Sequence, residues 1–220
     1  MKLEFINVSK VNNRKKQTYH LLEANIDFAE QEGVAVLSSH ERSTTSLLKL
    51  ISGVEAPTRG LIKREGIFTV PIGDAAYFHR ELSCEESIRF ICKVYGQDSN
   101  RIIKDIKEFA SIGKELKQKF KGQPATLKRK IAISTSLLMN SDVYQLTGVL
   151  NHPQPKFNKN IQNRLDEIAK KATLILATTS TELLTKYAQR VIVIDGQGYL
   201  QQFSDLQSGI EAHKAQKTGK

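Results

Sequence analysis

The chain lacks any apolar run long enough to cross a membrane. Its longest uninterrupted apolar stretches, such as 172–177 and 191–194, are short and bounded by polar residues, whereas a membrane-spanning helix needs about 20 apolar residues. The N-terminal segment carries Glu4 where a signal peptide would need its apolar centre. The sequence therefore predicts neither a transmembrane helix nor an exported protein.

Cysteine is also scarce, and tryptophan is absent. The two cysteines, Cys84 and Cys92, lie eight residues apart in a segment with a helical pattern, without a C-x-x-C spacing or nearby histidines. This arrangement excludes a disulfide framework and a thiolate metal site of the usual spacing. We expect both side chains to be reduced thiols.

The chain is long, rich in apolar residues and positively charged. At 220 residues with 40% hydrophobic content, it can bury a full core as one large domain or as one domain with a subdomain. The net charge of +10 favours contact with anionic surfaces such as membrane headgroups or nucleic acid. Charge alone does not choose between those partners.

Hydrophobic periodicity predicts strands at both ends of the chain and helices in its middle. Strands are expected at 3–5, 20–28, 34–37, 61–63, 66–70, 143–146, 174–177 and 191–194. Helical spacing appears at 46–51, across 85–119, at 126–139 and at 160–171. The residues 196–202 are expected to form a hairpin, and a basic tail follows from His213.

The segment between the strand at 34–37 and the helix at 46–51 occupies the place of a phosphate-binding loop. Its residues fill the eight positions of the frame G-x-x-x-x-G-K-[ST], in the order Ser38, Ser39, His40, Glu41, Arg42, Ser43, Thr44 and Thr45. Only Thr45 fits the frame, because serines replace both glycines and Thr44 replaces the lysine. The pattern suggests a nucleotide-hydrolase fold that has lost its nucleotide chemistry.

Several strings extend this interpretation to most of the chain. They are Thr45 to Gly60 (TSLLKLISGVEAPTRG), Phe90 to Gly96 (FICKVYG) and Ala172 to Ala177 (ATLILA). Over about residues 2–204, the chain resembles the nucleotide-binding subunit of an ABC transporter, and in particular the branch that exports capsular polysaccharide.

The resemblance implies an α/β fold of the P-loop NTPase type, with a mixed-sheet core, an N-terminal antiparallel β part and a helical subdomain. The expected divisions are 1–77 for the β-rich part with the phosphate-loop core, 78–136 for the helical subdomain, 137–204 for the return to the core, and 205–220 for the basic tail.

Other functional positions of the family also carry unsuitable residues when they are transferred to this chain. The adenine-stacking aromatic falls on Asn12, with Tyr19 nearby as an alternative. The metal- and water-binding glutamine falls on His79, and the signature serine and glycine fall on Ala125 and Thr126. The catalytic Asp-Glu pair falls on Thr147 and Gly148, and the switch histidine falls on Thr179.

These replacements remove the chemistry of phosphoryl transfer, which depends on positioning and on neutralising charge. Serines restrict the backbone that glycines would leave free, and Thr44 removes the cation that reaches the phosphates. Glu41 places a carboxylate at a helix N-terminus, where the protein supplies an anion of its own. We therefore expect no catalytic residue, no metal site, and weak or absent binding of ATP and magnesium.

Three further features admit both a functional and an ordinary interpretation. His40, His79 and His152 lack companions at metal-ligand spacing, so we expect surface or turn histidines. The basic run 114–130 is better interpreted as a solvated helical face than as a lipid or nucleic-acid site. The carboxylates Glu81, Glu85 and Glu86 can grip a partner's coupling helix or favour a helix N-terminus, and Ser83 with Glu86 fits a capping box.

The expected function is that of a non-hydrolysing ATPase-like subunit of a polysaccharide exporter, acting as scaffold or regulator. Its expected partners are a membrane permease and a second ABC ATPase-like subunit, identical or different, on the cytoplasmic face of the membrane. One alternative is a divergent ATPase rebuilt from His79, Arg42 and Thr45. Another is a basic protein that binds nucleic acid or another polyanion, although we expect no nucleic-acid partner.

Overall fold

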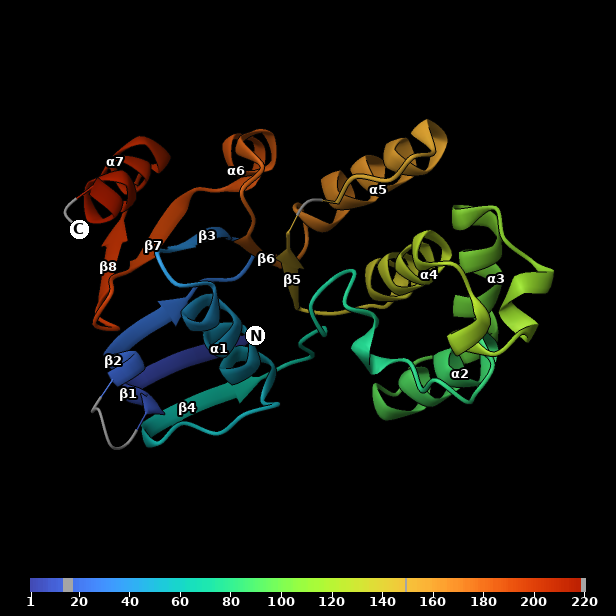
Figure 1. Cartoon of the computed structure of the whole chain (residues 1–220), viewed down its shortest axis with the longest axis horizontal. Coiled ribbons are helices and arrows are strands. Elements are labelled where there is room, and N and C mark those ends of the chain that lie inside the picture. Colours follow the sequence, from blue (N-terminus) through green and yellow to red (C-terminus); the bar gives the residue numbers. More distant parts are fainter. Residues whose placement is uncertain (14–17, 149, 219–220) are drawn as a thin grey trace. The chain divides into compact units, whose positions relative to one another are not determined.

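The computed structural model describes residues 1–13, 18–148 and 150–218 of the chain (Figure 1). The chain divides into two compact units. The sheet unit comprises Met1–Phe68, Asp142–Val149 and Ile168–Lys220, and the helical unit comprises Thr69–Ser141 and Leu150–Glu167.

An antiparallel sheet is formed by strands near the N-terminus of the chain. The strands β1 (Lys2–Asn13), β2 (Thr18–Phe28) and β4 (Arg59–Glu65) pair in the order β2-β1-β4. Alternate residues in the second half of β2, Ala24, Ile26 and Phe28, are buried, as expected for a sheet with one face on a core. This confirms the predicted antiparallel β part.

The second sheet is mixed and forms the core of the sheet unit. The strands β5 (Val143–Thr147), β6 (Thr173–Ala177), β3 (Gly33–Ser38) and β7 (Arg190–Ile194) are parallel, and β8 (Leu200–Phe203) pairs antiparallel with β7, in the order β5-β6-β3-β7-β8. The apolar runs of the parallel strands are almost wholly buried, which explains why they show no alternation in the sequence.

The helix α1 (Glu41–Ser52) follows β3 directly, in the strand, turn and helix order that the sequence predicts. It buries Leu47, Leu50 and Ile51 completely. Gly53 ends the helix in the left-handed conformation with φ of 75°, a backbone geometry that glycine adopts without steric cost.

The C-terminal segment, for which the sequence predicts a basic tail, forms the helix α7 (Leu206–Thr218). It packs on β3, β7 and β8. A Cβ atom at Gly209 would lie 2.6 Å from Cβ of Val191, so the absence of a side chain at Gly209 allows this close packing. The shorter helix α6 (Thr181–Tyr187) lies between β6 and β7 in the chain.

The helical unit contains α2 (Cys84–Val94), α3 (Ser99–Ala110), α4 (Ala125–Leu138) and α5 (Pro155–Ile168), and the short 3₁₀ turns η1 (Ala75–Tyr77), η2 (Lys114–Lys117) and η3 (Phe120–Gly122). Ile88, Ile106 and Ile131 lie in its core. Both cysteines are free and buried, and burial raises the pKa of the Cys84 thiol to about 11. The absence of a disulfide between them agrees with the reduced thiols that the sequence predicts.

The predicted capping box is confirmed at the start of α2. The Ser83 hydroxyl accepts a hydrogen bond from the Glu86 backbone N–H at 3.1 Å, and the Glu86 carboxylate accepts one from the Ser83 N–H at 2.7 Å. These reciprocal bonds satisfy donors that every helix N-terminus leaves open.

Several sequence-based expectations differ from the structure. The helical unit begins at Thr69 and includes 150–167, beyond the expected 78–136. The helix predicted at 160–171 is α5 and begins at Pro155. The predicted strand at 66–70 is wrong: only Phe68 makes a bridge, to Val143. The Asp142 carboxylate accepts the Ile67 N–H at 2.7 Å, so this donor is not available to a strand ladder.

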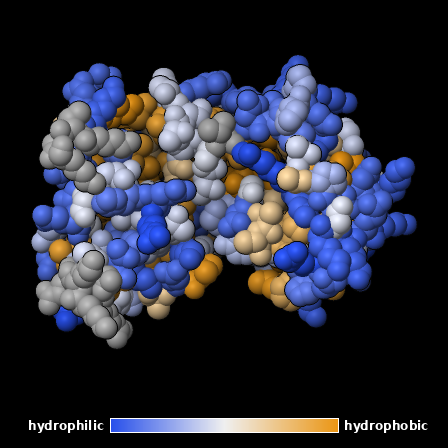
Figure 2. Space-filling model, in the orientation of Figure 1, coloured by the Kyte–Doolittle hydropathy of each residue, from blue (hydrophilic) through white to orange (hydrophobic). Residues whose placement is uncertain are grey.

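The surface is largely polar on the face that Figure 2 shows, where hydrophobic side chains gather only in small areas. Across the described residues, no helix combines the length and apolar character that membrane crossing requires.

Candidate functional site

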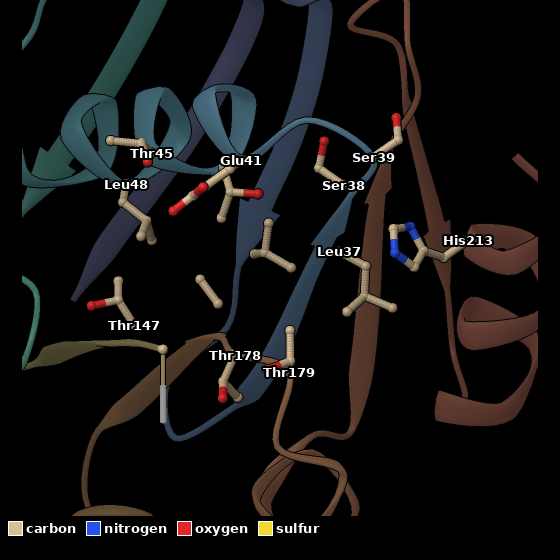
Figure 3. A pocket seen from close by; sticks show the side chains of 14 residues that line it. Leu37, Ser38, Ser39, Glu41, Thr45, Leu48, Thr147, Thr178, Thr179 and His213 are labelled. Carbon is tan, nitrogen blue, oxygen red and sulfur yellow. The ribbon is translucent and has the colours of Figure 1, made fainter. Parts of the chain in front are cut away.

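A cavity of about 400 Å³ opens in the sheet unit where β3, β5 and β6 end and α1 begins. In parallel sheets, ligands bind at the carboxyl ends of the strands, so this is the natural place for a site. Hydroxyl side chains dominate its polar lining (Figure 3), namely Ser38, Ser39, Thr44, Thr45, Thr147, Thr178 and Thr179. The cavity brings together most of the positions that the sequence selected.

The connection between β3 and α1 is short. The strand ends at Ser38 and the helix begins at Glu41, so Ser39 and His40 form the whole turn. Within this fully described stretch, 38–45, the backbone has no positive φ. A glycine-rich phosphate loop needs room for its N–H groups to surround a phosphate, and this tight turn offers less of that room.

Glu41 points its carboxylate into the cavity from the first residue of α1 (Figure 3). The described residues provide no hydrogen bond or ion pair to this carboxylate, and His40 at the N-cap position gives no side-chain cap. A negative charge at this helix end is stabilised by the helix dipole. Glu41 therefore occupies, as an anion, the helix end where a phosphate group would be favoured.

The opposite wall comes from the ends of β5 and β6 and from α7. Thr147 ends β5 and Gly148 follows it, and the Gly148 N–H donates to the Ala177 carbonyl at 3.1 Å. Thr178 and His213 also line the cavity, and sequence reasoning missed both. Thr178 follows directly on a predicted parallel strand, which was a usable signal, whereas His213 lies in a segment expected to be a tail.

The lining carries little positive charge. Among the described lining residues there is no lysine or arginine. Three phosphate-loop positions lie outside this lining: Ser43 is buried within α1, His40 is exposed, and Arg42 lines a different cavity. The cavity can donate and accept hydrogen bonds, but it lacks a fixed cation to neutralise a phosphate.

The second cavity, of about 300 Å³, lies between α1 and the β1–β2 pair and is strongly charged. Glu55 forms ion pairs with Lys49 at 2.9 Å and with Lys10 at 3.1 Å. The hydrogen bond from Lys49 lowers the pKa of Glu55, and burial lowers the pKa of His20. Asn12 is absent from the described lining of both cavities.

The remaining predicted positions lie in the helical unit. His79 is exposed, and its Nδ1 accepts the Glu81 N–H at 3.3 Å. Ala125 and Thr126 are exposed at the first turn of α4. His152 lies in the connection between β5 and α5, in line with the expected surface or turn histidine, but it is 7% exposed because its ring packs edge-on against Phe157 at 5.1 Å.

The residues at the end of β5 do not fit a magnesium ion. The described chain contains no cluster of three His, Cys, Asp or Glu side chains that could hold a metal. At the end of β5, Thr147 and Gly148 offer no carboxylate, which is the ligand that magnesium prefers. No step of a metal-dependent reaction can be assigned to this cavity.

Comparison with known proteins finds relatives over nearly the whole chain, although no family model matches. The chain is 27% identical over 214 residues to the capsule polysaccharide export ATP-binding protein CtrD of Neisseria meningitidis serogroup B, covering 96% of this chain and 99% of that protein. It is 28% identical over 184 residues to the ATP-binding protein BexA of Haemophilus influenzae, covering 83% and 84%.

The fold is also found among solved structures. An ATP-binding subunit of an ABC transporter superimposes with a TM-score of 0.76 at 15% identity, covering 99% of this chain and all of that one. The expected fold class, an α/β ABC nucleotide-binding domain with a mixed sheet, is confirmed. The chain thus has the fold of an ABC transporter ATPase subunit and is related in sequence to the ATP-binding proteins of capsule polysaccharide export.

Proposed function

We propose that the chain is an ABC-type subunit of a saccharide exporter that does not hydrolyse ATP and acts as scaffold or regulatory partner. Its fold and relatives support the transporter part of the proposal. One observation carries the non-hydrolysing part: the described lining of the cavity at β3, β5 and β6 has a carboxylate, Glu41, and no lysine or arginine.

The physical reason is that the phosphate groups of ATP are negatively charged and must be neutralised during the reaction. Phosphoryl transfer needs cations around the phosphates and a carboxylate that holds magnesium or orients water. In this chain Thr44 takes the lysine position, and Thr147 and Gly148 take the Asp-Glu positions. Losing one such group commonly costs about two to three powers of ten in rate, and several are missing together.

The permease is the proposed partner on the membrane side. The helix α2 exposes Phe90 and Val94, which lie one turn apart and are 63% and 65% exposed. Two large apolar side chains on one exposed helix face favour contact with another protein. We assign this face to the permease, which places the subunit on the cytoplasmic side of the membrane.

A second ATPase-like subunit, identical or different, is the other proposed partner. It would meet the surfaces around 38–45 and 124–127. If it is an intact ATPase, its phosphate loop would face Ala125, which lacks the hydroxyl of the family's serine, and Thr126, which lacks the flexibility of the family's glycine. That composite site would also be impaired.

Phosphate release by the purified chain tests the proposal, with CtrD of Neisseria meningitidis measured in parallel. The proposal expects no release above the buffer background, with or without magnesium. Sustained turnover that is lost in a Thr45→Val variant would instead establish the alternative of a divergent ATPase. Steeply salt-dependent binding to DNA or RNA, without recovery of a permease, would favour the polyanion-binding alternative.

A further inference from the structure

The helical unit buries a lysine that has no acidic partner. Lys130, on α4, is 4% exposed, although lysine is almost never fully buried unless it is paired. No aspartate or glutamate oxygen of the described residues lies within 4 Å of its Nζ atom, as the ion pairs of the unit show. A buried charge without a counter-charge is costly, so this position needs an explanation.

The contacts of Lys130 satisfy only some of the hydrogen-bond donors of its ammonium group. Its Nζ donates to Oε1 of Gln154 at 2.5 Å and lies 5.1 Å from the centre of the Phe157 ring. Glu115 exerts an electrostatic attraction, but its carboxylate already accepts the Gly113 N–H at 2.8 Å. An ammonium has three donors, and two of those on Lys130 have no acceptor within the described residues.

A cavity of about 330 Å³ lies beside this lysine, entirely within the helical unit. Its walls are mostly apolar: Phe109 and Phe157 meet edge to face at 5.6 Å, and Pro153 and Pro155 flank them. Its other polar lining residues are Ser111, Gln154, Lys156 and Asn160. A small apolar cavity with one buried cation has the features of a binding site for a small molecule.

We propose that this cavity binds a small organic monoanion, with a carboxylate on Lys130 and an aromatic or aliphatic body against Phe109 and Phe157. Among the described lining residues, Lys130 is buried and matches one negative charge, whereas the second lysine, Lys156, is exposed to solvent. The apolar walls match a body without further polar groups. A ligand with several phosphates would leave most of its charge without a partner. This site is separate from the cavity at Ser38, and the proposal does not depend on whether the chain hydrolyses ATP.

Benzoate is a suitable probe, because it combines one carboxylate with one ring, and benzyl alcohol is its neutral match. Titration of the full-length ¹⁵N-labelled protein is expected to give saturable amide shifts centred on Ser111 and Phe157, with benzoate binding at least tenfold more tightly than benzyl alcohol. Equal affinities for the two probes, or no saturable shifts with benzoate, would overturn the proposal. This test uses the unmodified protein alone.

Two neutral variants, Lys130→Met and Lys130→Gln, test the residue itself. Each is expected to weaken benzoate binding at least tenfold. The control Lys128→Met, two residues earlier on the same helix, removes a charge that is bonded to the Lys121 carbonyl outside the cavity and should leave binding unchanged. Circular dichroism establishes which variants are folded, and undiminished benzoate binding in either folded Lys130 variant contradicts the proposal.

Discussion

Glu41 and Thr147 line one cavity from opposite sides, Glu41 at the first residue of α1 and Thr147 at the last residue of β5 (Figure 3). In an ATPase of this fold, the cation would be expected on the α1 side and the carboxylate on the β5 side. Here the carboxylate stands on the α1 side and a neutral hydroxyl on the β5 side, and this reversal is the core of the functional proposal.

Neutralising Glu41 is expected to destabilise the fold slightly. The Glu41→Gln variant removes a charge that interacts favourably with the α1 dipole, so the free energy of unfolding should fall by about 0.3–1 kcal/mol. Urea denaturation at low salt measures the difference. The matched control is Glu108→Gln, near the C-terminal end of α3, where removal of a negative charge should not destabilise. Equal losses in the two variants would argue against the dipole explanation.

The fold was largely predictable because its signals are local. The buried parallel strands are uninterrupted apolar runs, and the box of Ser83 and Glu86 is a short motif. The predicted strand at 66–70 failed because the carboxylate of Asp142, distant in sequence, takes the Ile67 N–H. The segment expected to be a basic tail is the helix α7, which packs on the sheet. The weak amphipathic pattern of 206–218 does not indicate this packing.

The candidate site was predictable in part for the same reason. The frame at 38–45 is contiguous, and most of its residues meet in the cavity. His213 joins them only through tertiary packing. The burial of Lys130 is likewise invisible in a run of basic residues, since it depends on Phe157, which comes from another helix.

Replacing the exposed apolar pair of α2 is expected to weaken recovery of the permease. In the double variant Phe90→Ser and Val94→Ser, both side chains are solvent-exposed, so the free energy of unfolding should change by less than about 0.5 kcal/mol per site. Co-purification with the permease, expressed together with this chain, measures the effect. The control Leu61→Ser, 54% exposed on β4, should leave recovery intact, and a similar loss in both would refute the assigned docking face.

Glu55 should contribute a pH-dependent part of the stability. Its pKa in the folded chain lies below the ordinary value of 4.5, chiefly because Lys49 donates a hydrogen bond to it. The contribution is therefore complete above that value and is lost as the pH falls through the lowered pKa. Between neutral pH and about pH 3, the native protein should lose more stability than Glu55→Gln. Equal losses of unfolding free energy in the two proteins over this pH range would contradict this expectation.

Arg190 is expected to be a stabilising residue of the sheet unit. Its guanidinium makes two 2.8 Å bonds to the Glu32 carboxylate and another to the Asp27 carbonyl. Because charge-assisted bonds contribute about 1.5–3 kcal/mol each and are not additive, Arg190→Ala should lower the free energy of unfolding by at least about 2 kcal/mol. Chemical denaturation measures it. The control Arg101→Ala, exposed on α3, should change it little.

Isothermal titration of the purified chain with ATP and magnesium tests whether the cavity at β3, β5 and β6 accepts a nucleotide. CtrD of Neisseria meningitidis serves as the positive control under the same conditions. We expect no saturable heat with millimolar ATP, because Glu41 repels the phosphates and the described lining of the cavity offers no lysine. Saturable binding with micromolar affinity would contradict it.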